Sequence, residues 1–543
     1  MSGMEAGSST TRDHASSLDL LKAALAGLYT PRRLALVVLL QGLLLLGHVS
    51  TSWHASSDSA LYMGLGRSIL EGQGYVFNYE PHAMVPPLFP LLLAGVMKVF
   101  GPSYLALNLC QVALALACTL MALRLFRRLY GDDLGFLGTG LFALSFVLWV
   151  TASMVISDLL FCLLAMGGML AATWAAAPSR GRWGAVLVTG ALIAACSLVR
   201  VNGLVLLPGA VVALWWGWKD RPRIVRALAV AAMIAASVAP LKLWQGYVGS
   251  IRAGQGATYL QTSHLSKPFG EMIGGVCRNL FLELPTEMSN MLVGFSDVPA
   301  VLNLLLPAAA IVGCAVCLRD RRPIVPLTLL GMMGLLGVVS GVRMRFLLFL
   351  APGLYVLALV GITAAVRAAR RGRGLSAAPL RKALLISLGV VVAIHVGHSG
   401  ARLYKFRRGS VPGGHRLGER QGWFTACEYM IRHDPGASAG RPMGTAVLTR
   451  RPALVHYLTR AKTLPTKGYV PISPERMLRY VHEYRPQYLL AEAGDERTER
   501  ALAAIRRAGA TAEKVPGLQL TGRITLWRIT YALSESTTSE AAS

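Results

Sequence analysis

The chain has 543 residues, of which 54% are hydrophobic and only 15% are charged, and its formal net charge is +27. A soluble domain has about a quarter charged residues, so this composition excludes an ordinary soluble protein and predicts a polytopic membrane protein. The Lys and Arg residues fall in short clusters between apolar runs, as they do in cytoplasmic loops. The positive charge therefore does not indicate a nucleic-acid partner.

Apolar runs and basic clusters alternate along the chain. Arg32 and Arg33 precede the first run, which places the N-terminal segment 1–33 in the cytoplasm by the positive-inside rule. The later basic clusters also fall on the cytoplasmic side, at every second connection between apolar runs. This alternation predicts about eleven spans of bilayer length. The predicted spans are 34–50, 104–126, 134–153, 159–177, 183–199, 203–218, 227–245, 297–318, 323–341, 346–366 and 383–400. The short run 86–100 is predicted to be a re-entrant or membrane-surface helix.

The chain changes character after residue 400. Residues 401–531 mix helix-like stretches with strand-like ones such as LQLTGRITLWRIT, which predicts a small α/β domain. An odd number of spans places this domain outside the cytoplasm. The predicted fold class is thus an all-α polytopic membrane protein with a small extracytoplasmic α/β domain, followed by a disordered tail over 532–543.

Five ionisable residues interrupt the apolar pattern at predicted outer turns. They are Asp58, Asp158, Arg200, Arg343 and Arg345. Ionisable side chains beside membrane segments are costly and are usually functional or paired. Each also has a structural interpretation, because the two acids could be helix N-caps and the three arginines could anchor the chain at the interface.

Two acids and three arginines on one face predict a site that binds an anion and activates a nucleophile. Arginine holds phosphate and neutralises the charge that develops on it. A carboxylate takes the proton from an acceptor hydroxyl as that hydroxyl attacks an anomeric carbon. A sugar linked to a lipid phosphate satisfies both requirements. The alternatives are a transporter or flippase for a lipid-linked or anionic solute, and an inactive scaffold.

Several segments resemble those of a known enzyme class. DSALYMGLGRSILEGQGY, followed by PHAMVPPLFPLLLAGVMKVFG, resembles the first outer loop of the GT-C membrane glycosyltransferases. The likeness is greatest to bacterial relatives of the dolichyl-phosphate-mannose protein mannosyltransferases and to the lipid A aminoarabinose transferase. SDLLF, SLVRVNGL and RMRFLLFLAP are similar to later motifs of these enzymes, so the resemblance extends over about residues 34–360.

The resemblance implies a GT-C transmembrane domain over 34–400 with a catalytic first outer loop at 51–103. It implies transfer of a sugar from a polyprenyl-phosphate carrier to a protein, lipid or polysaccharide acceptor, at the outer face of the bacterial cytoplasmic membrane.

The same resemblance assigns roles to residues. Asp58 would be the catalytic acid/base and Asp158 a second acidic site, while Arg200 and Arg345 would approach the donor phosphate. Arg343 and Tyr62 are further candidates for substrate binding. Some relatives use a divalent cation, which is left open for this chain, and no other cofactor is expected.

Overall fold

The structure is a computed structural model, and it describes most of the chain. The described residues are 16–49, 56–82, 84–177, 182–251, 268–293, 298–339, 342–369, 377–407, 417–434, 445–465, 472–492, 494–518, 520 and 524–531. The tail predicted to be disordered, 532–543, lies outside them.

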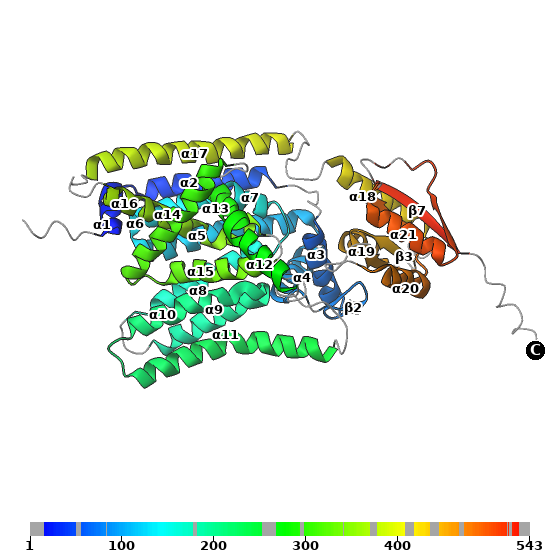
Figure 1. The fold of residues 1–543 in the computed structure, drawn as a ribbon, viewed down its shortest axis with the longest axis horizontal. Helices are drawn as coiled ribbons and strands as arrows, with labels where there is room; N and C mark the ends of the chain where they lie inside the picture. The colour runs from blue at the N-terminus through cyan, green and yellow to red at the C-terminus, as the bar shows by residue number, and fades with distance from the viewer. Residues whose placement is uncertain are drawn as a thin grey trace, which may run out of the picture.

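A bundle of helices forms the larger part of the molecule, and a smaller domain with a sheet sits at one end of it (Figure 1). The helices before the sheet domain are α1 (Ser17–Leu25), α2 (Pro31–Gly47), α3 (Ser57–Leu70), α4 (Leu88–Phe100), α5 (Tyr104–Tyr130), α6 (Asp132–Ala143), α7 (Phe146–Ala152), α8 (Asp158–Ala175), α9 (Trp183–Val199), η2 (Val201–Leu206), α10 (Leu207–Gly217), α11 (Arg223–Ile251), α12 (Phe269–Arg278), η5 (Asn279–Glu283), α13 (Leu284–Val293), α14 (Ala300–Arg319), α15 (Ile324–Val338), η6 (Met344–Leu350), α16 (Ala351–Ala369) and α17 (Ala377–Arg407).

The predicted spans coincide with helices, but fewer of them than expected are long enough to cross a bilayer. Among the described residues, six helices have the length and apolar composition of a span. These candidate spans are Tyr104–Tyr130, Asp158–Ala175, Arg223–Ser250, Ala300–Arg319, Met344–Ala369 and Arg381–Ala401. Judged by length and composition alone, the described helices therefore give fewer spans than the predicted number of about eleven.

The difference has two structural causes. The predicted span 134–153 is broken into α6 and α7, which meet at an angle of 52°, and counting this pair as one span gives up to seven in the described chain. The break falls where Ser145 caps α7 by accepting a hydrogen bond from the Leu148 N–H. Three further predicted spans form shorter apolar helices, Trp183–Val199, Val201–Gly217 and Ile324–Val338, and the predicted span 34–50 forms α2, which has 17 residues. The helix α4 has 13 residues, too few to span a bilayer, which agrees with a re-entrant or surface helix.

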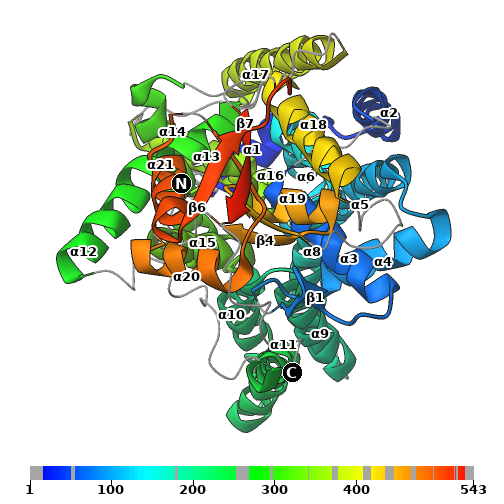
Figure 2. The same cartoon turned by 90° about the vertical axis from the view of Figure 1, so that its right-hand side faces the viewer.

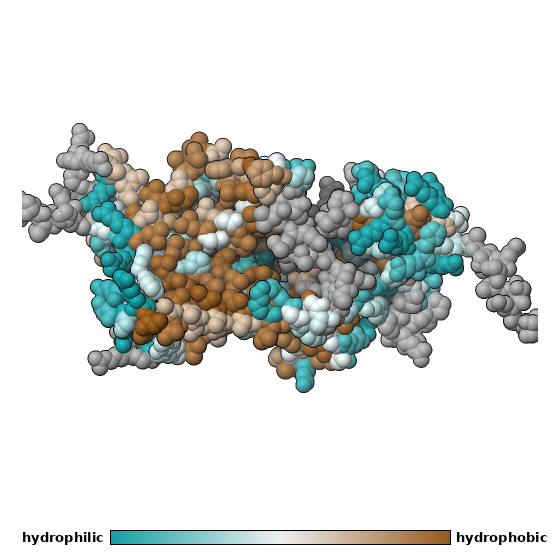
Figure 3. Space-filling view, turned by 60° about the horizontal axis from the view of Figure 1, so that its bottom comes forward, coloured by the Kyte–Doolittle hydropathy of each residue, from teal (hydrophilic) through white to brown (hydrophobic). Residues whose placement is uncertain are grey.

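The surface of the bundle is apolar where lipid would cover it. Figure 3 shows a broad hydrophobic band over the helices, with hydrophilic side chains at one end of the bundle and on the sheet domain at the other. Large exposed apolar side chains on this surface include Leu36, Leu243, Leu304 and Ile386. An exposed apolar surface of this extent is expected only where lipid or protein replaces water.

Glycines bring two core helices into direct backbone contact. A Cβ at Gly313 of α14 would lie 2.0 Å from the Leu357 carbonyl oxygen of α16, and a Cβ at Gly361 of α16 would lie 1.8 Å from the Ala309 carbonyl oxygen. Small residues at both crossings therefore allow α14 and α16 to pack closely, as in other membrane bundles. This packing fixes α16 and with it the turn η6 that precedes it.

The sheet domain confirms the predicted α/β domain. Its elements are α18 (Leu417–His433), β3 (Ala446–Thr449), α19 (Pro452–Thr459), β4 (Lys462–Pro465), α20 (Pro474–Tyr484), β5 (Tyr488–Glu492), α21 (Glu496–Arg507), β6 (Ala510–Lys514) and β7 (Ile524–Tyr531). The strand order is β4-β3-β5-β7-β6, with β3 parallel to both β4 and β5, and β7 antiparallel to both β5 and β6.

Both faces of this sheet are covered. Leu448, Leu489 and Trp527 pack in one core with Val481 of α20 and Ile505 of α21. The neighbouring strand residues point to the opposite face, as the period of two requires. Viewed along the bundle, the domain lies over the end of the bundle that carries α3 and α4 (Figure 2).

Candidate active site

The helix α3 begins with a capping box that does not involve Asp58. The Ser56 side chain accepts a hydrogen bond from the Ser59 N–H, and the Ser59 hydroxyl lies 3.0 Å from the Ser56 N–H. Asp58 lies in the first turn and its side chain is 47% exposed. The interpretation of Asp58 as the N-cap is therefore wrong, because two serines already satisfy this helix end.

Asp158 is likewise not a cap. It is the first residue of α8, the cap position belongs to Ser157, and the Asp158 side chain is only 3% exposed. The Ser157 hydroxyl instead forms a 2.8 Å hydrogen bond with the Tyr62 hydroxyl of α3. This bond joins the starts of α3 and α8.

Arginines link the two acids into one network. Arg345, in η6, donates to Asp58 Oδ2 across 2.7 Å, and another nitrogen of the same guanidinium lies 3.9 Å from Asp158 Oδ2. Arg200, at the end of α9, donates to Asp158 Oδ1 across 2.6 Å. Four of the predicted site residues, from four separate segments, thus form the chain Asp58–Arg345–Asp158–Arg200.

Aromatic rings surround these groups. The Phe346 ring lies beside both guanidinium groups, with its centroid 5.1 Å from Arg200 Cζ and 5.6 Å from Arg345 Cζ. Such cation–π contacts stabilise guanidinium groups that are partly removed from water. Tyr62 packs edge-on against Phe89 of α4, with 5.0 Å between ring centroids. Burial raises the pKa of the Tyr62 hydroxyl, which therefore stays protonated.

Arg343 lies apart from this network. It is exposed at the start of η6, and its charge lowers the pKa of Glu287 of α13, a smaller effect than the burial that raises this pKa. Glu287 accepts a hydrogen bond from the Met344 N–H across 3.1 Å, and Glu283 accepts one from the Val342 N–H across 3.3 Å. The two glutamates therefore hold the backbone just before Arg345.

Glu283 and Glu287 were not among the residues predicted for the site. A signal for them was present, because they stand four residues apart and so share one face of a helix in an otherwise apolar stretch. What the sequence lacked was any sign that this face meets η6. The same holds for Ser157 and Phe346, whose roles depend entirely on which helices are neighbours.

The network is electrically balanced, with two carboxylates and two guanidinium groups. Its two acids differ in access, since the Asp58 side chain is 47% exposed and that of Asp158 is 3% exposed. Among the residues that the structure describes, no three His, Cys, Asp or Glu side chains are grouped closely enough to hold a metal ion. The described residues thus do not fit a dedicated metal site.

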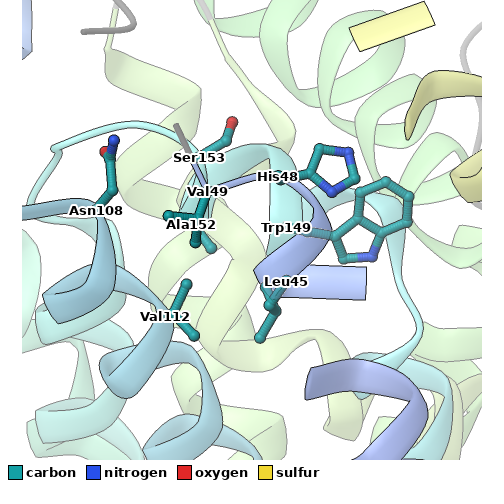
Figure 4. Close-up of a pocket in the computed structure, with 8 residues that line it drawn as sticks. All are labelled: Leu45, His48, Val49, Asn108, Val112, Trp149, Ala152 and Ser153. Atoms are coloured by element: carbon teal, nitrogen blue, oxygen red, sulfur yellow. The ribbon is translucent and has the colours of Figure 1, made fainter. Parts of the chain in front are cut away.

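A crevice in the bundle lies between α2, α5 and α7 and contains none of the predicted site residues. His48, Asn108, Trp149 and Ser153 line it together with apolar side chains (Figure 4). His48 Nδ1 lies 2.7 Å from the Leu44 carbonyl oxygen, and its ring packs at 4.8 Å from that of Trp149. His48 is thus bonded within its own helix.

Part of the chain matches a known protein family. Residues 84–244 match the family described as dolichyl-phosphate-mannose-protein mannosyltransferase. No protein with curated annotation matches the chain.

Two kinds of solved structure share the fold across most of the chain. ArnT from Cupriavidus metallidurans in the apo state is 13% identical with a TM-score of 0.58, and the match covers 92% of this chain and 98% of ArnT. The archaeal oligosaccharyltransferase AglB from Archaeoglobus fulgidus, in complex with an inhibitory peptide and a dolichol-phosphate, is 11% identical with a TM-score of 0.54. That match covers 93% of this chain and 74% of AglB.

ArnT has also been solved bound to undecaprenyl phosphate, and in that form it is 14% identical with a TM-score of 0.56, covering 92% of this chain and 98% of ArnT. The chain thus has the fold of these proteins over most of its length, and residues 84–244 also match the mannosyltransferase family. Its long apolar helices are those of a multi-pass membrane protein.

Proposed function

We propose that this protein transfers a sugar from a polyprenyl-phosphate carrier to an acceptor hydroxyl at the outer face of the cytoplasmic membrane. The observation that supports the proposal is the chain Asp58–Arg345–Asp158–Arg200, in which two carboxylates and two guanidinium groups lie side by side. The match to mannosyltransferases and the ArnT and AglB structures with bound lipid phosphates support the choice of donor.

Asp58 is the general base in this proposal. It is the more exposed of the two acids, so an acceptor hydroxyl can reach it. The hydroxyl oxygen attacks C1 of the sugar, with inversion, while its proton passes to the Asp58 carboxylate. The bond between C1 and the phosphate oxygen breaks, and its electron pair leaves with the polyprenyl phosphate.

Arg345 and Arg200 bind the phosphate. Each guanidinium is partly exposed, at 27% and 20% of its side chain, and presents several N–H donors. Their charge stabilises the negative charge that develops on the leaving phosphate. Asp158 is too deeply buried to receive the acceptor, and it orients both arginines.

The long carrier explains the architecture. A polyprenyl chain stays in the bilayer while its phosphate reaches the membrane surface, so the enzyme needs spans around the site and polar groups at their ends. In this proposal the chain crosses the membrane an odd number of times, with about eleven spans that include the shorter helices. The N-terminal segment is then cytoplasmic, and the site and the sheet domain face outward.

The direct experiment is a transfer assay with the purified protein. A radiolabelled polyprenyl-phosphate sugar is supplied together with cell-surface glycans, lipid A or secreted protein as acceptors. The proposal predicts label in one acceptor and release of polyprenyl phosphate. Movement of intact donor across vesicles without release of the phosphate would instead indicate a flippase.

A further inference from the structure

A short hairpin follows α3 and makes an unusual turn. β1 (Val76–Phe77) pairs with β2 (Glu80–Pro81), and the two turn residues, Asn78 and Tyr79, have positive φ angles of 58° and 65°. Two-residue turns of this kind favour Asn followed by Gly. Tyr at the second position is locally unfavourable, so the turn is not optimised for its own stability.

The tip of the hairpin is held by the sheet domain. The Asn78 amide donates to the Thr463 carbonyl oxygen across 2.9 Å, and its oxygen accepts from the Thr463 N–H across 2.8 Å. The Asn78 N–H donates to His456 Nε2 across 3.1 Å. The Tyr79 hydroxyl donates to the Arg460 carbonyl oxygen. The tyrosine that is unfavourable in the turn is thus used in this contact.

Ion pairs reinforce the same contact. Glu71, at the end of α3, lies 2.5 Å from an Arg460 nitrogen, and Glu80 of β2 lies 2.6 Å from Lys462 Nζ. Exposed pairs of this kind are individually weak. The two ion pairs favour the pairing of these two surfaces, while the hydrogen bonds of Asn78 fix its geometry.

The hairpin is in turn fixed against α3. A Cβ at Gly64 of α3 would lie 2.6 Å from the Phe77 ring, so the absence of a side chain allows β1 to pack directly on the helix. On another face of α3, a Cβ at Gly66 would lie 3.1 Å from the Pro90 carbonyl oxygen of α4. The helix that carries Asp58 is therefore held between α4 and a hairpin that the sheet domain grips.

We propose that the sheet domain is a positioning element of the active site, with Asn78, Tyr79 and Arg460 as positioning residues. They act on α3 through Phe77 and Glu71, and so hold Asp58 in its position beside Arg345. This inference rests on the proposed function for its effect on transfer, but the contact itself is measurable without transfer. It gives the C-terminal domain a part in the chemical step in addition to any part in acceptor choice.

The replacement Tyr79→Gly tests the proposal most sharply. Glycine is better suited to the turn than tyrosine, so the hairpin stays formed while the contact with Arg460 is lost. We expect a fall in kcat of about tenfold or more, since small misplacements of catalytic groups have effects up to about a hundredfold. We also expect faster hydrogen exchange in α3. If Tyr79→Gly had the same kcat and the same hydrogen exchange in α3 as the wild-type protein, the proposal would be overturned.

A charge exchange supplies a rescue test. Glu71→Arg and Arg460→Glu each place like charges together and are expected to lower kcat with little change in donor KM. The double variant restores the pair and is expected to recover most of the loss. Glu496→Arg is the matched control, because Glu496 pairs with Arg500 on the exposed face of α21. Equal activity of both single variants and the control would contradict positioning.

The two proposals fail in different ways. If the wild-type protein transfers no sugar from any polyprenyl-phosphate donor, the proposed function is wrong, and hydrogen exchange of α3 still reports whether the sheet domain holds it. If the wild-type protein is active and Tyr79→Gly is equally active, the function stands and the positioning role is wrong.

Discussion

Arg345 donates to Asp58 across 2.7 Å, so the group proposed to bind the donor phosphate also holds the proposed base. A phosphate that draws this guanidinium away would leave the Asp58 carboxylate free to accept a proton. Binding of the donor would then prepare the base, and the acceptor would be deprotonated only when a donor is present.

Replacing Arg345 by lysine should weaken donor binding. An ammonium group is compact and cannot contact both Asp58 and a phosphate as the planar guanidinium can. Loss of one charge-assisted hydrogen bond of about 1.5 kcal/mol corresponds to a rise of about tenfold in donor KM. Steady-state kinetics at varied donor concentration measure this KM. Arg127→Lys, at the pair of Arg127 with Asp132, is the control, and an unchanged donor KM in Arg345→Lys would refute the assignment.

Asp158 should matter for stability as well as activity. Its carboxylate is 3% exposed and lies 2.6 Å from Arg200, so Asp158→Asn leaves two guanidinium groups without their buried counter-charge. The expected loss is about 1–3 kcal/mol. Thermal unfolding in detergent should show a lower Tm for Asp158→Asn than for Asp58→Asn, whose side chain is half exposed. Equal Tm values would mean that the buried pair contributes little.

Glu287 should act on Arg345 through the backbone. Glu287→Ala removes the acceptor for the Met344 N–H, whereas Glu287→Gln keeps a carbonyl oxygen in its place. A lost hydrogen bond of about 1 kcal/mol corresponds to a fall of about fivefold in kcat. The glutamine variant should retain most of the wild-type rate. Equal rates for alanine and glutamine would show that the turn holds Arg345 without this bond.

The contact between hairpin and sheet domain should weaken in acid. His456 Nδ1 lies 2.8 Å from the Ala461 carbonyl oxygen and therefore carries the proton, which leaves Nε2 to accept from the Asn78 N–H. Burial lowers the pKa of His456, and the nearby charges of Lys462, Arg460 and Arg67 lower it further. The docked state thus favours neutral imidazole.

The direction of this pH effect follows from the lowered pKa of His456. The contact is fully stable above the ordinary histidine pKa of about 6.5, and the stability is lost as the pH falls toward the lower pKa of the docked state. Hydrogen exchange of α3 between pH 7.5 and 5 should show increasing exposure after correction for the intrinsic rate. His456→Gln should remove this pH dependence, and an identical pH dependence in this variant would assign it to other groups.

The membrane class and the grouping of four charged residues could be predicted because both leave local signals. Long apolar runs give spans, and Asp58, Asp158, Arg200 and Arg345 stand out as charges that apolar segments tolerate only for a reason. Charge counting placed these four on one face, and the structure brings them into contact.

Other features depend on neighbours that local patterns do not specify. Asp58 was open to interpretation as an N-cap because the sequence SSDS offers several capping residues, and only geometry shows that Ser56 is the one used. The break between α6 and α7 falls at Ser145, whose side chain accepts a hydrogen bond from the Leu148 N–H, a contact that the local sequence does not specify. Arg343 was grouped with Arg345 because both fall at a predicted outer turn, yet the charge of Arg343 acts on Glu287.

The hairpin contact was beyond prediction for the same reason. Asn78 and Thr463 are 385 residues apart, and nothing in either local sequence indicates the other. The positive φ angle of Tyr79 becomes informative only once its hydroxyl is seen at Arg460.

The central claim is that Asp58 is the general base, and the rate of sugar transfer by Asp58→Asn tests it most directly. Asparagine keeps the size of the side chain and a partner for Arg345 but cannot take a proton at this step. Asp132→Asn, at an exposed pair with Arg127 in α5 and α6, is the matched control. We predict that Asp58→Asn folds normally and loses transfer by about a hundredfold or more, while the control keeps the wild-type rate. Near-normal transfer by Asp58→Asn would contradict the claim.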